Sequence, residues 1–309
     1  MINTLFNRFR EVLRSREVFR NWLSAAIHYA FTNPRACINV SCRSGGRVCI
    51  DPALYAYVIR GFYLGLIHEV TCDKEDNALV IDGLKVKLTY NDDYFDLGSA
   101  KFKHSYVPIF HVFHVLLHVF AKQEYGLVDV RGRVIVDVGA FVGDSAIYFV
   151  LKGARKVYAI EPHPGAYAEM LENIKLNNMQ DKIVPINVAI GSKPGRAKIP
   201  NNYAFNKAIT YYESSINKDT EVSMVTLEQI INNYKIEPDV LKMDCEGCEF
   251  DLILNDYEHV RLFKELIFEY HEGDGRKLAN LLIKLSNDYK CKVINEGSVG
   301  MVHCVKLNL

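Results

Sequence analysis

The strongest constraint on the fold lies in the second half of the chain, where short apolar runs alternate with helical stretches. The apolar runs have the length and composition of buried strands and cover residues 134–138, 156–160, 183–188, 240–243, 266–269, 292–294 and 301–305. Stretches with apolar residues at helical spacing lie between most of them, at 146–151, 165–177, 227–234, 250–254 and 275–289. Strands that alternate with helices form βαβ units and a mostly parallel sheet. We therefore predict a doubly wound α/β domain, Rossmann-like in type, over residues 126–309.

Residues 1–125 have a different pattern and predict an N-terminal α+β accessory region. Residues 1 to about 30 carry apolar side chains at helical spacing with arginines between them, which predicts a helix. Short β-rich runs follow, and Asp82-Gly83 between two of them predicts a hairpin. Residues 106–124 again predict a helix. A basic amphipathic helix at the N-terminus suits weak contact with a membrane surface, although packing on its own domain is the interpretation we favour.

Charge and cysteine content bound the class of protein. The 309 residues hold 37 Lys and Arg against 37 Asp and Glu, and this balance argues against a broad nucleic-acid-binding surface. No apolar run is long enough to span a bilayer, and no signal-like segment opens the chain. The eight cysteines are irregularly spaced, and Cys245-x-x-Cys248 has no second pair at zinc-ribbon spacing. We therefore expect reduced thiols, a cytoplasmic location and no bound metal.

A cofactor site is predicted in the turn after residues 134–138, because ligands of open α/β sheets bind beyond the carboxyl ends of the strands. Asp137 ends that strand, and Gly139 and Gly143 follow it. This Gly-x-x-x-Gly spacing differs from the Gly-x-Gly-x-x-Gly that cradles a pyrophosphate. It disfavours a nicotinamide oxidoreductase and suits a methionine-derived cofactor without phosphate, whose amino-acid end needs acidic and amide partners.

Glu161 adds a second acidic position, at the end of the next strand and 24 residues after Asp137. A carboxylate at this place can accept hydrogen bonds from both hydroxyls of a ribose. The two acids on consecutive strands predict a nucleoside-bearing cofactor more strongly than either does alone.

Several segments resemble the FkbM family of S-adenosylmethionine-dependent methyltransferases, over roughly residues 124–272. The most specific is Lys242-Met-Asp244-Cys-Glu246-Gly-Cys-Glu249, which matches that family's Lys-x-Asp-x-Glu-Gly-x-Glu signature; the others are 134–143, 156–164, 173–177 and 187–190. The resemblance implies a class I methyltransferase fold, S-adenosylmethionine as cofactor, and Asp137, Gly139, Gly143 and Glu161 as cofactor contacts. We expect their neighbours Ala140, Asp144 and Pro162, together with Val188, to complete the cofactor site.

Methyl transfer to a hydroxyl needs an aligned acceptor and a base for its proton. The resemblance places Asp244 at the end of its strand, facing the methyl group, and we expect Asp244 with Glu246 to orient the acceptor. His271 is a candidate base because imidazole titrates near neutral pH. Asp244, Glu246 and Glu269 offer oxygen ligands that suit magnesium or calcium, but such acids are common in cofactor clefts without metal. Residues 203–212 form a long insertion that suits the wall of an acceptor pocket.

The predicted function is methylation of a hydroxyl on a sugar, glycan or other small or lipid-linked acceptor. One alternative is a tRNA or other nucleic-acid methyltransferase, because residues 156–177 also look like that stretch in archaeal tRNA guanine methyltransferases. Against it, Asp244-Cys-Glu-Gly stands where an amino-methylating enzyme has Asn/Asp-Pro-Pro-Tyr/Phe. A second alternative is a non-catalytic cofactor-binding module. The sequence leaves the oligomeric state open.

Overall fold

The computed structural model describes residues 12–31, 37–88, 94–199 and 220–307. These residues fall into two compact units, residues 1–123 and 124–309. The predicted insertion at residues 203–212 lies outside the described residues. No helix in the described ranges is both long enough and apolar enough to cross a membrane.

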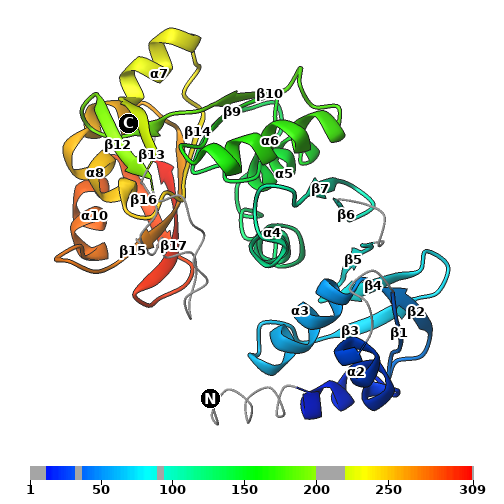
Figure 1. The fold of residues 1–309 in the computed structure, drawn as a ribbon. Coiled ribbons are helices and arrows are strands. Elements are labelled where there is room, and N and C mark those ends of the chain that lie inside the picture. The colour runs from blue at the N-terminus through cyan, green and yellow to red at the C-terminus, as the bar shows by residue number, and fades with distance from the viewer. Residues whose placement is uncertain (1–11, 32–36, 89–93, 200–219, 308–309) are drawn as a thin grey trace. The chain divides into compact units, whose positions relative to one another are not determined.

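The first unit combines helices with small antiparallel sheets (Figure 1). Its helical elements are the 3₁₀ turn η1 (Ser15–Glu17), α2 (Trp22–Phe31), α3 (Pro52–Tyr63), α4 (Ile109–Leu116) and the π-helical turn η2 (Leu117–Ala121). Its strands are β1 (Ile38–Ser41), β2 (Arg47–Ile50), β3 (Val70–Asp73), β4 (Ala78–Ile81), β5 (Leu84–Val86), β6 (Tyr94–Asp96) and β7 (Lys101–Lys103). The hairpin predicted at Asp82-Gly83 is confirmed, since β4 pairs antiparallel with β5 across it.

Two elements of the first unit differ from the prediction. The single helix expected over residues 1 to about 30 is wrong for its described part, where η1 and α2 are separate. The chain breaks between them because Phe19 is buried and pairs with Cys42, while Arg20 N–H donates to Ser41 at the end of β1. The helix α3 was not predicted. Its start is marked by Asp51, whose side chain caps Ala53 N–H, and by proline in the first turn.

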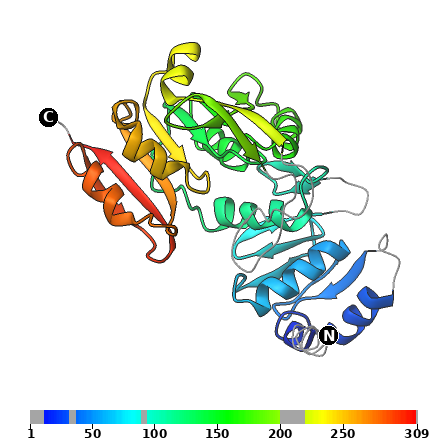
Figure 2. The ribbon, with the colours of Figure 1, turned by 60° about the vertical axis from the view of Figure 1, so that its left-hand side comes forward.

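A seven-stranded sheet forms the centre of the second unit, in the order β10-β9-β8-β14-β15-β17-β16 (Figures 1 and 2). The parallel strands are β8 (Val134–Val138), β9 (Lys156–Ile160), β10 (Ile183–Ile186), β14 (Val240–Met243) and β15 (Glu265–His271). β17 (Val299–Lys306) runs antiparallel between β15 and β16 (Tyr289–Val293). Because β8 lies where the strand order reverses, its carboxyl end is the topological switch point. The predicted doubly wound α/β fold is confirmed.

Helices cover this sheet in two groups. α5 (Asp144–Leu151) packs on β8, β9 and β10, and α6 (Pro164–Leu176) packs on β10. α8 (Cys248–Asn255) packs on β15 and on α10 (Leu278–Leu285), which also contacts β16. α7 (Leu227–Tyr234) contacts the short α9 (Tyr257–Val260), and β11 (Ala189–Ile190), β12 (Gly195–Ile199) and β13 (Thr220–Val225) make a small separate sheet.

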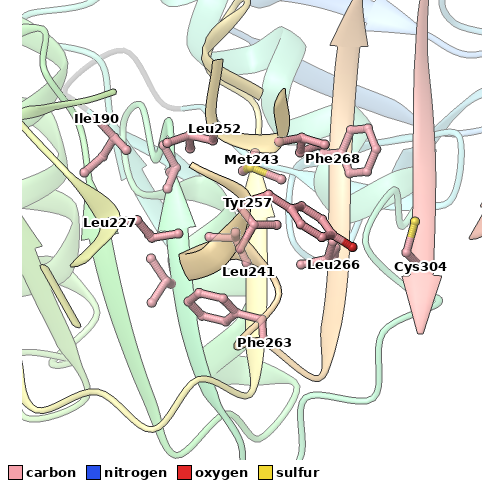
Figure 3. Packing of buried hydrophobic residues seen from close by; sticks show 14 of the residues in the cluster. Ile190, Leu227, Leu241, Met243, Leu252, Tyr257, Phe263, Leu266, Phe268 and Cys304 are labelled. Carbon is pink, nitrogen blue, oxygen red and sulfur yellow. The ribbon is translucent and has the colours of Figure 1, made fainter. Parts of the chain in front are cut away.

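A hydrophobic core of the second unit lies on one face of the sheet, where alternate residues of β8, β14 and β15 meet the helices α7, α8 and α10 (Figure 3). Leu241 and Met243 of β14 point into this core beside Leu266 and Phe268 of β15. Side chains alternate between the faces of a strand, so Lys242 and the residues opposite it point to the other face. Packing of this core therefore determines which side chains of β8 and β14 lie together on the opposite face of the sheet.

Ion pairs and hydrogen bonds hold the amino-terminal edge of the sheet together. Asp239, just before β14, accepts hydrogen bonds from Val134 N–H at 3.0 Å and from Lys264 Nζ at 2.7 Å. Glu265, the first residue of β15, pairs with Arg133 and with His303. These partners outweigh burial and lower the pKa of both carboxyls. The starts of β8, β14 and β15 are therefore tied together at the edge opposite the switch point.

All eight cysteines are paired, so the expectation of reduced thiols is wrong. The bonds are Cys37–Cys49, Cys42–Cys72, Cys245–Cys248 and Cys291–Cys304. The sequence spacing of the cysteines did not predict these pairs, because most of the partners are brought together only by the fold. Cys291 and Cys304, for example, are directly opposite each other on β16 and β17.

Gly139 is the position where the turn after β8 depends most on the absence of a side chain. Its φ is +77°, and a Cβ there would lie 1.8 Å from the backbone oxygen of Asp244. Gly132 also has a positive φ, +69°, but open space around it. We expect Gly139→Ala to lower the melting temperature of the second unit much more than Gly132→Ala, which carries only the cost of the left-handed backbone, about 1–2 kcal/mol. Thermal unfolding of both variants measures this, and equal shifts would contradict the tight turn.

Candidate active site

The site begins with a buried ion pair between neighbouring strands. Asp137 of β8 and Lys242 of β14 are register partners, and Lys242 Nζ lies 3.0 Å from Asp137 Oδ1. Their side chains are 0% and 1% exposed. Burial alone would lower the pKa of Lys242, but the charges of Asp137, Asp244 and Asp144 outweigh it and raise the pKa. The lysine is therefore cationic and holds the carboxyl ends of both strands together.

The same pair fixes the turn after β8. Lys242 Nζ donates to the backbone oxygen of Gly139 at 2.7 Å, and Ser145 Oγ donates to Asp137 Oδ2 at 2.6 Å. The Gly139 and Ala140 amides both donate to Ile160 of β9. These amides are thus engaged by the protein itself. Gly143, with φ of +83°, lets α6 approach, because a Cβ there would lie 3.0 Å from Met170 Cγ.

Glu161 lies directly after β9, where it was predicted, and is buried. Its two carboxylate oxygens accept hydrogen bonds from Phe141 N–H at 2.9 Å and from His163 N–H at 2.7 Å. Burial nevertheless raises the pKa of Glu161 to about 7. The carboxylate is held rigidly against the turn after β8, and each of its oxygens still has a second lone pair for a ligand.

The remaining predicted cofactor residues surround these two acids. Asp144 opens α5 and is buried; its Oδ1 has no hydrogen-bond partner among the described residues. Burial, aided by the charge of Asp137, raises the pKa of Asp144 to about 7. Ala140 is fully buried in the turn, and Pro162 and Val188 are half-buried on the chain that follows β9 and β10.

A group of acids follows β14, beside the turn after β8. We call Asp244–Gly247 the acidic loop. Asp244 N–H donates to Val138, the last residue of β8, at 3.0 Å. Burial and the nearby charge of Glu269 raise the pKa of Asp244 well above its usual value. Within the acidic loop, Glu246 and Gly247 take positive φ angles of 57° and 120°.

His271, at the end of β15, lies among carboxylates. Its Nε2 is 3.2 Å from both Glu246 and Glu269, and its Nδ1 is 3.8 Å from Glu249. Burial lowers the pKa of His271, but the carboxylates of Glu249, Glu269 and Glu246 outweigh it and raise the pKa to about 11. The imidazole is thus cationic at neutral pH, which weighs against the base role predicted for it. In the described parts of the chain, no cluster has the geometry of a metal site.

Glu249 joins the acidic loop to β15. It is fully buried in the first turn of α8, and its Oε2 accepts from Gly247 N–H at 2.9 Å. Its Oε1 accepts from His271 N–H at 3.3 Å. Support of the helix start is therefore only part of its role, because this carboxylate also links the backbones of two neighbouring strand ends.

Tyr125 is a site residue that the sequence did not indicate. Its hydroxyl lies 3.5 Å from Asp244 Oδ2, and Lys242 Nζ lies 5.6 Å from the centre of its ring. Its ring also packs at 5.5 Å from that of Phe149 in α5. Tyr125 precedes β8 outside any motif, so only the folded chain reveals it. Lys242 was also given no role from the sequence, although it is part of the Lys242–Glu249 signature.

Comparison with known proteins shows which family the chain belongs to. The sequence matches the methyltransferase FkbM domain over residues 137–291, half of the chain. The chain belongs to this family. The methyltransferase domain of this family is the one predicted, in agreement with the predicted family and fold class. The matched segment includes the turn after β8, Glu161, the acidic loop and His271.

Individual relatives are distant. The chain is 46% identical over 55 residues to ribosomal protein L11 methyltransferase of Carboxydothermus hydrogenoformans, covering 18% of each. It is 24% identical over 191 residues to methyltransferase sdnD of Sordaria araneosa, covering 51% of this chain and 74% of that protein. The structure of M. jannaschii TYW2 in complex with AdoMet aligns with a TM-score of 0.39 at 16% identity, over 72% of this chain and 90% of that one. The chain thus spans less than a fifth of the first relative.

The residues at the switch point fit S-adenosylmethionine. That cofactor presents hydrogen-bond donors, the ribose hydroxyls and an ammonium group, and it carries no phosphate. The edge offers acceptors to match: the second lone pairs of the Glu161 carboxylate and the buried, unpartnered Oδ1 of Asp144.

We expect Asp137 and Lys242 to stabilise the domain only when both charges are present. Lys242→Met leaves Asp137 as an unpaired buried charge, and we expect it to lower the free energy of unfolding by about 3–5 kcal/mol. The double variant Asp137→Asn with Lys242→Met removes both charges and should lose clearly less. Urea denaturation measures all three proteins. A single variant as stable as the parent would contradict the proposed pairing.

Proposed function

We propose that this chain transfers a methyl group from S-adenosylmethionine to the hydroxyl of an uncharged acceptor, such as a sugar, a glycan or another small or lipid-linked molecule. The observation that carries the proposal is the group of carboxylates, Asp244, Glu246, Glu249 and Glu269, beside the predicted cofactor site. His271 lies among these carboxylates, and the cations Lys242 and Arg276 lie close to the acidic loop, so the negative charge of this wall is partly compensated. The wall still disfavours phosphate-rich acceptors and suits neutral hydroxyls, whose protons it can accept.

Asp244 is the group to which we assign the acceptor proton. The cofactor supplies the activated methyl group, and the protein aligns the acceptor and takes its proton. His271 is cationic and has no lone pair for another proton, so it fits a positioning role between Glu246 and Glu269. Burial and Glu269 make the ionised Asp244 a stronger base than an exposed aspartate. Tyr125 and Glu246 flank the same carboxylate and suit orientation of the acceptor.

Nucleic acid is the alternative acceptor. Two solved structures are RNA-methyltransferase structures by title. Streptococcus pneumoniae Sp1610, titled a putative tRNA (m1A22) methyltransferase, aligns at 14% identity and a TM-score of 0.36, and PH1948 of Pyrococcus horikoshii, titled a putative RNA methyltransferase, at 14% and 0.30. Those likenesses are too low to carry an acceptor to this chain. The balanced net charge and the carboxylates of this wall both weigh against RNA.

The predicted cytoplasmic location stays a prediction, and the disulfides weigh against it. Four disulfide bonds persist most readily in an oxidising compartment. An acceptor found in such a compartment, for example a glycan, is compatible with the proposed chemistry.

Cofactor binding is expected to weaken in acid through Glu161. Its folded pKa of about 7 means that a proton occupies the proposed ribose acceptor below neutral pH. Because binding favours the ionised carboxylate, Glu161 by itself should raise the Kd for S-adenosylhomocysteine about tenfold for each pH unit below about 7, and Asp144, whose pKa is also about 7, steepens this dependence. Calorimetry at several pH values measures this. Glu161→Gln should bind weakly with a less steep profile, and Glu161→Gln combined with Asp144→Asn should show an almost flat one. Unchanged binding by Glu161→Gln would remove this residue from the site.

Methyl-labelled cofactor tests the acceptor class directly. We expect label from the incubated protein and cell extract in the glycan, lipid or small-molecule fractions. Asp244→Asn should bind S-adenosylhomocysteine as the parent does and transfer about 10²-fold more slowly. Label in RNA alone would contradict the proposal, and tight cofactor binding without label in any fraction would favour a non-catalytic module.

A further inference from the structure

The Cys245–Cys248 bond lies inside the acidic loop, and only Glu246 and Gly247 separate its cysteines. Both cysteines are half-buried, so a reductant can reach them. The other bonds span sequence separations of 12, 30 and 13 residues, and two of them include a fully buried cysteine, Cys42 or Cys304. A disulfide that closes a short loop constrains the unfolded chain least. Opening Cys245–Cys248 therefore threatens the fold least and the acidic loop most.

The two residues between the cysteines have a backbone conformation that is unfavourable for a chain without the disulfide bond. Glu246 has φ of 57°, a left-handed conformation that is uncommon for residues with a Cβ, and Gly247 follows at 120°. This conformation brings the Glu246 carboxylate within 3.2 Å of His271 Nε2. Without the bond, Glu246 is free to return to a right-handed or extended conformation, and its contact with His271 is lost.

Reduction would also change the hydrogen bonding of Glu249. Cys245 Sγ lies 3.5 Å from Glu249 Oε2. In the disulfide this sulfur carries no hydrogen, so the contact is not a hydrogen bond. A reduced Cys245 gains an S–H donor beside a carboxylate that already accepts from Gly247 and contacts His271. The redox state of one bond is thus coupled to two of the carboxylates around His271.

We propose that Cys245–Cys248 is a thiol–disulfide exchange site, at which a dithiol opens the bond and releases the acidic loop from the geometry that methyl transfer requires. The exchange site itself does not depend on the proposed function, but its effect on methyl transfer rests on it. One thiolate of the dithiol attacks a sulfur of the bond, forming a mixed disulfide and expelling the other cysteine as a thiolate. The second thiol of the dithiol then resolves the mixed disulfide. Two electrons and two protons pass to the protein, and the dithiol leaves as a disulfide.

Graded reduction with dithiothreitol tests the site on the folded chain. Free thiols are alkylated at each dithiothreitol concentration and located by peptide mass spectrometry. We expect Cys245 and Cys248 to be alkylated at concentrations that leave Cys291–Cys304 intact. Reduction of the two bonds at the same concentration would overturn the proposal.

The pKa of His271, followed by NMR of labelled histidine, tests the coupling without any acceptor. We expect it to fall by about one unit or more on selective reduction, because Glu246 leaves the imidazole. The variant Cys245→Ala with Cys248→Ala should show the same fall in oxidised protein, and the matched control Cys291→Ala with Cys304→Ala should not. If the alanine variant fails to fold, selective reduction of the parent still decides the point. An unchanged pKa in the reduced protein would overturn the proposal.

Label transfer separates this inference from the proposed function. Once an acceptor fraction is identified, the oxidised protein should transfer methyl groups at least about tenfold faster than the selectively reduced protein, because alignment of the acceptor contributes strongly to the rate. Equal rates would overturn the effect of exchange on activity and leave the methyltransferase function standing. Selective reduction and the pKa change without any methylated acceptor would overturn the function and leave the exchange site standing.

Discussion

The buried pair between Asp137 and Lys242 is the interaction on which the rest of the site depends. It lies where the strand order reverses, and it ties together the ends of β8 and β14, the Gly139 turn and the first turn of α5. Two charges taken out of water at this depth are stable only with each other and with further hydrogen bonds. The lysine and serine provide those bonds, so this polar pair holds the Gly139 turn and the start of α5 in place at the edge of the proposed cofactor site.

From this pair the site divides into two chemically different walls. On one side, Glu161 and Asp144 are buried acids whose raised pKa values reflect desolvation, and both suit a ligand rich in donors. On the other side, Asp244, Glu246, Glu249 and Glu269 surround a cationic His271. The backbone contact between Asp244 and the end of β8 joins the walls. This contact is the basis for our proposal that a methyl donor bound at the first wall faces the second.

Much of the fold and part of the site could be predicted from the sequence. The strands β8, β9 and β14 and the helix α7 have the predicted bounds, because largely buried strands and a capped amphipathic helix leave strong local patterns. The acids Asp137 and Glu161 were predictable because parallel strands bring their carboxyl ends to one edge. The cysteine pairs, Tyr125 and the charge state of His271 were not predictable. Three of the four cysteine pairs, the Tyr125–Asp244 contact and most of the carboxylates around His271 depend on residues that only the fold brings together.

The amino-terminal edge of the sheet is held together by Asp239, Arg133 and Glu265. This edge and the opposite edge therefore have separate roles. The starts of β8, β14 and β15 are secured at that edge, away from the loops to which we assign the acceptor. Changes in those loops that leave the Asp137–Lys242 pair and the Gly139 turn in place can then occur without loss of the sheet. Such a separation favours evolutionary diversification, in which one scaffold with a constant methyl donor acquires new acceptors through changes confined to the opposite edge.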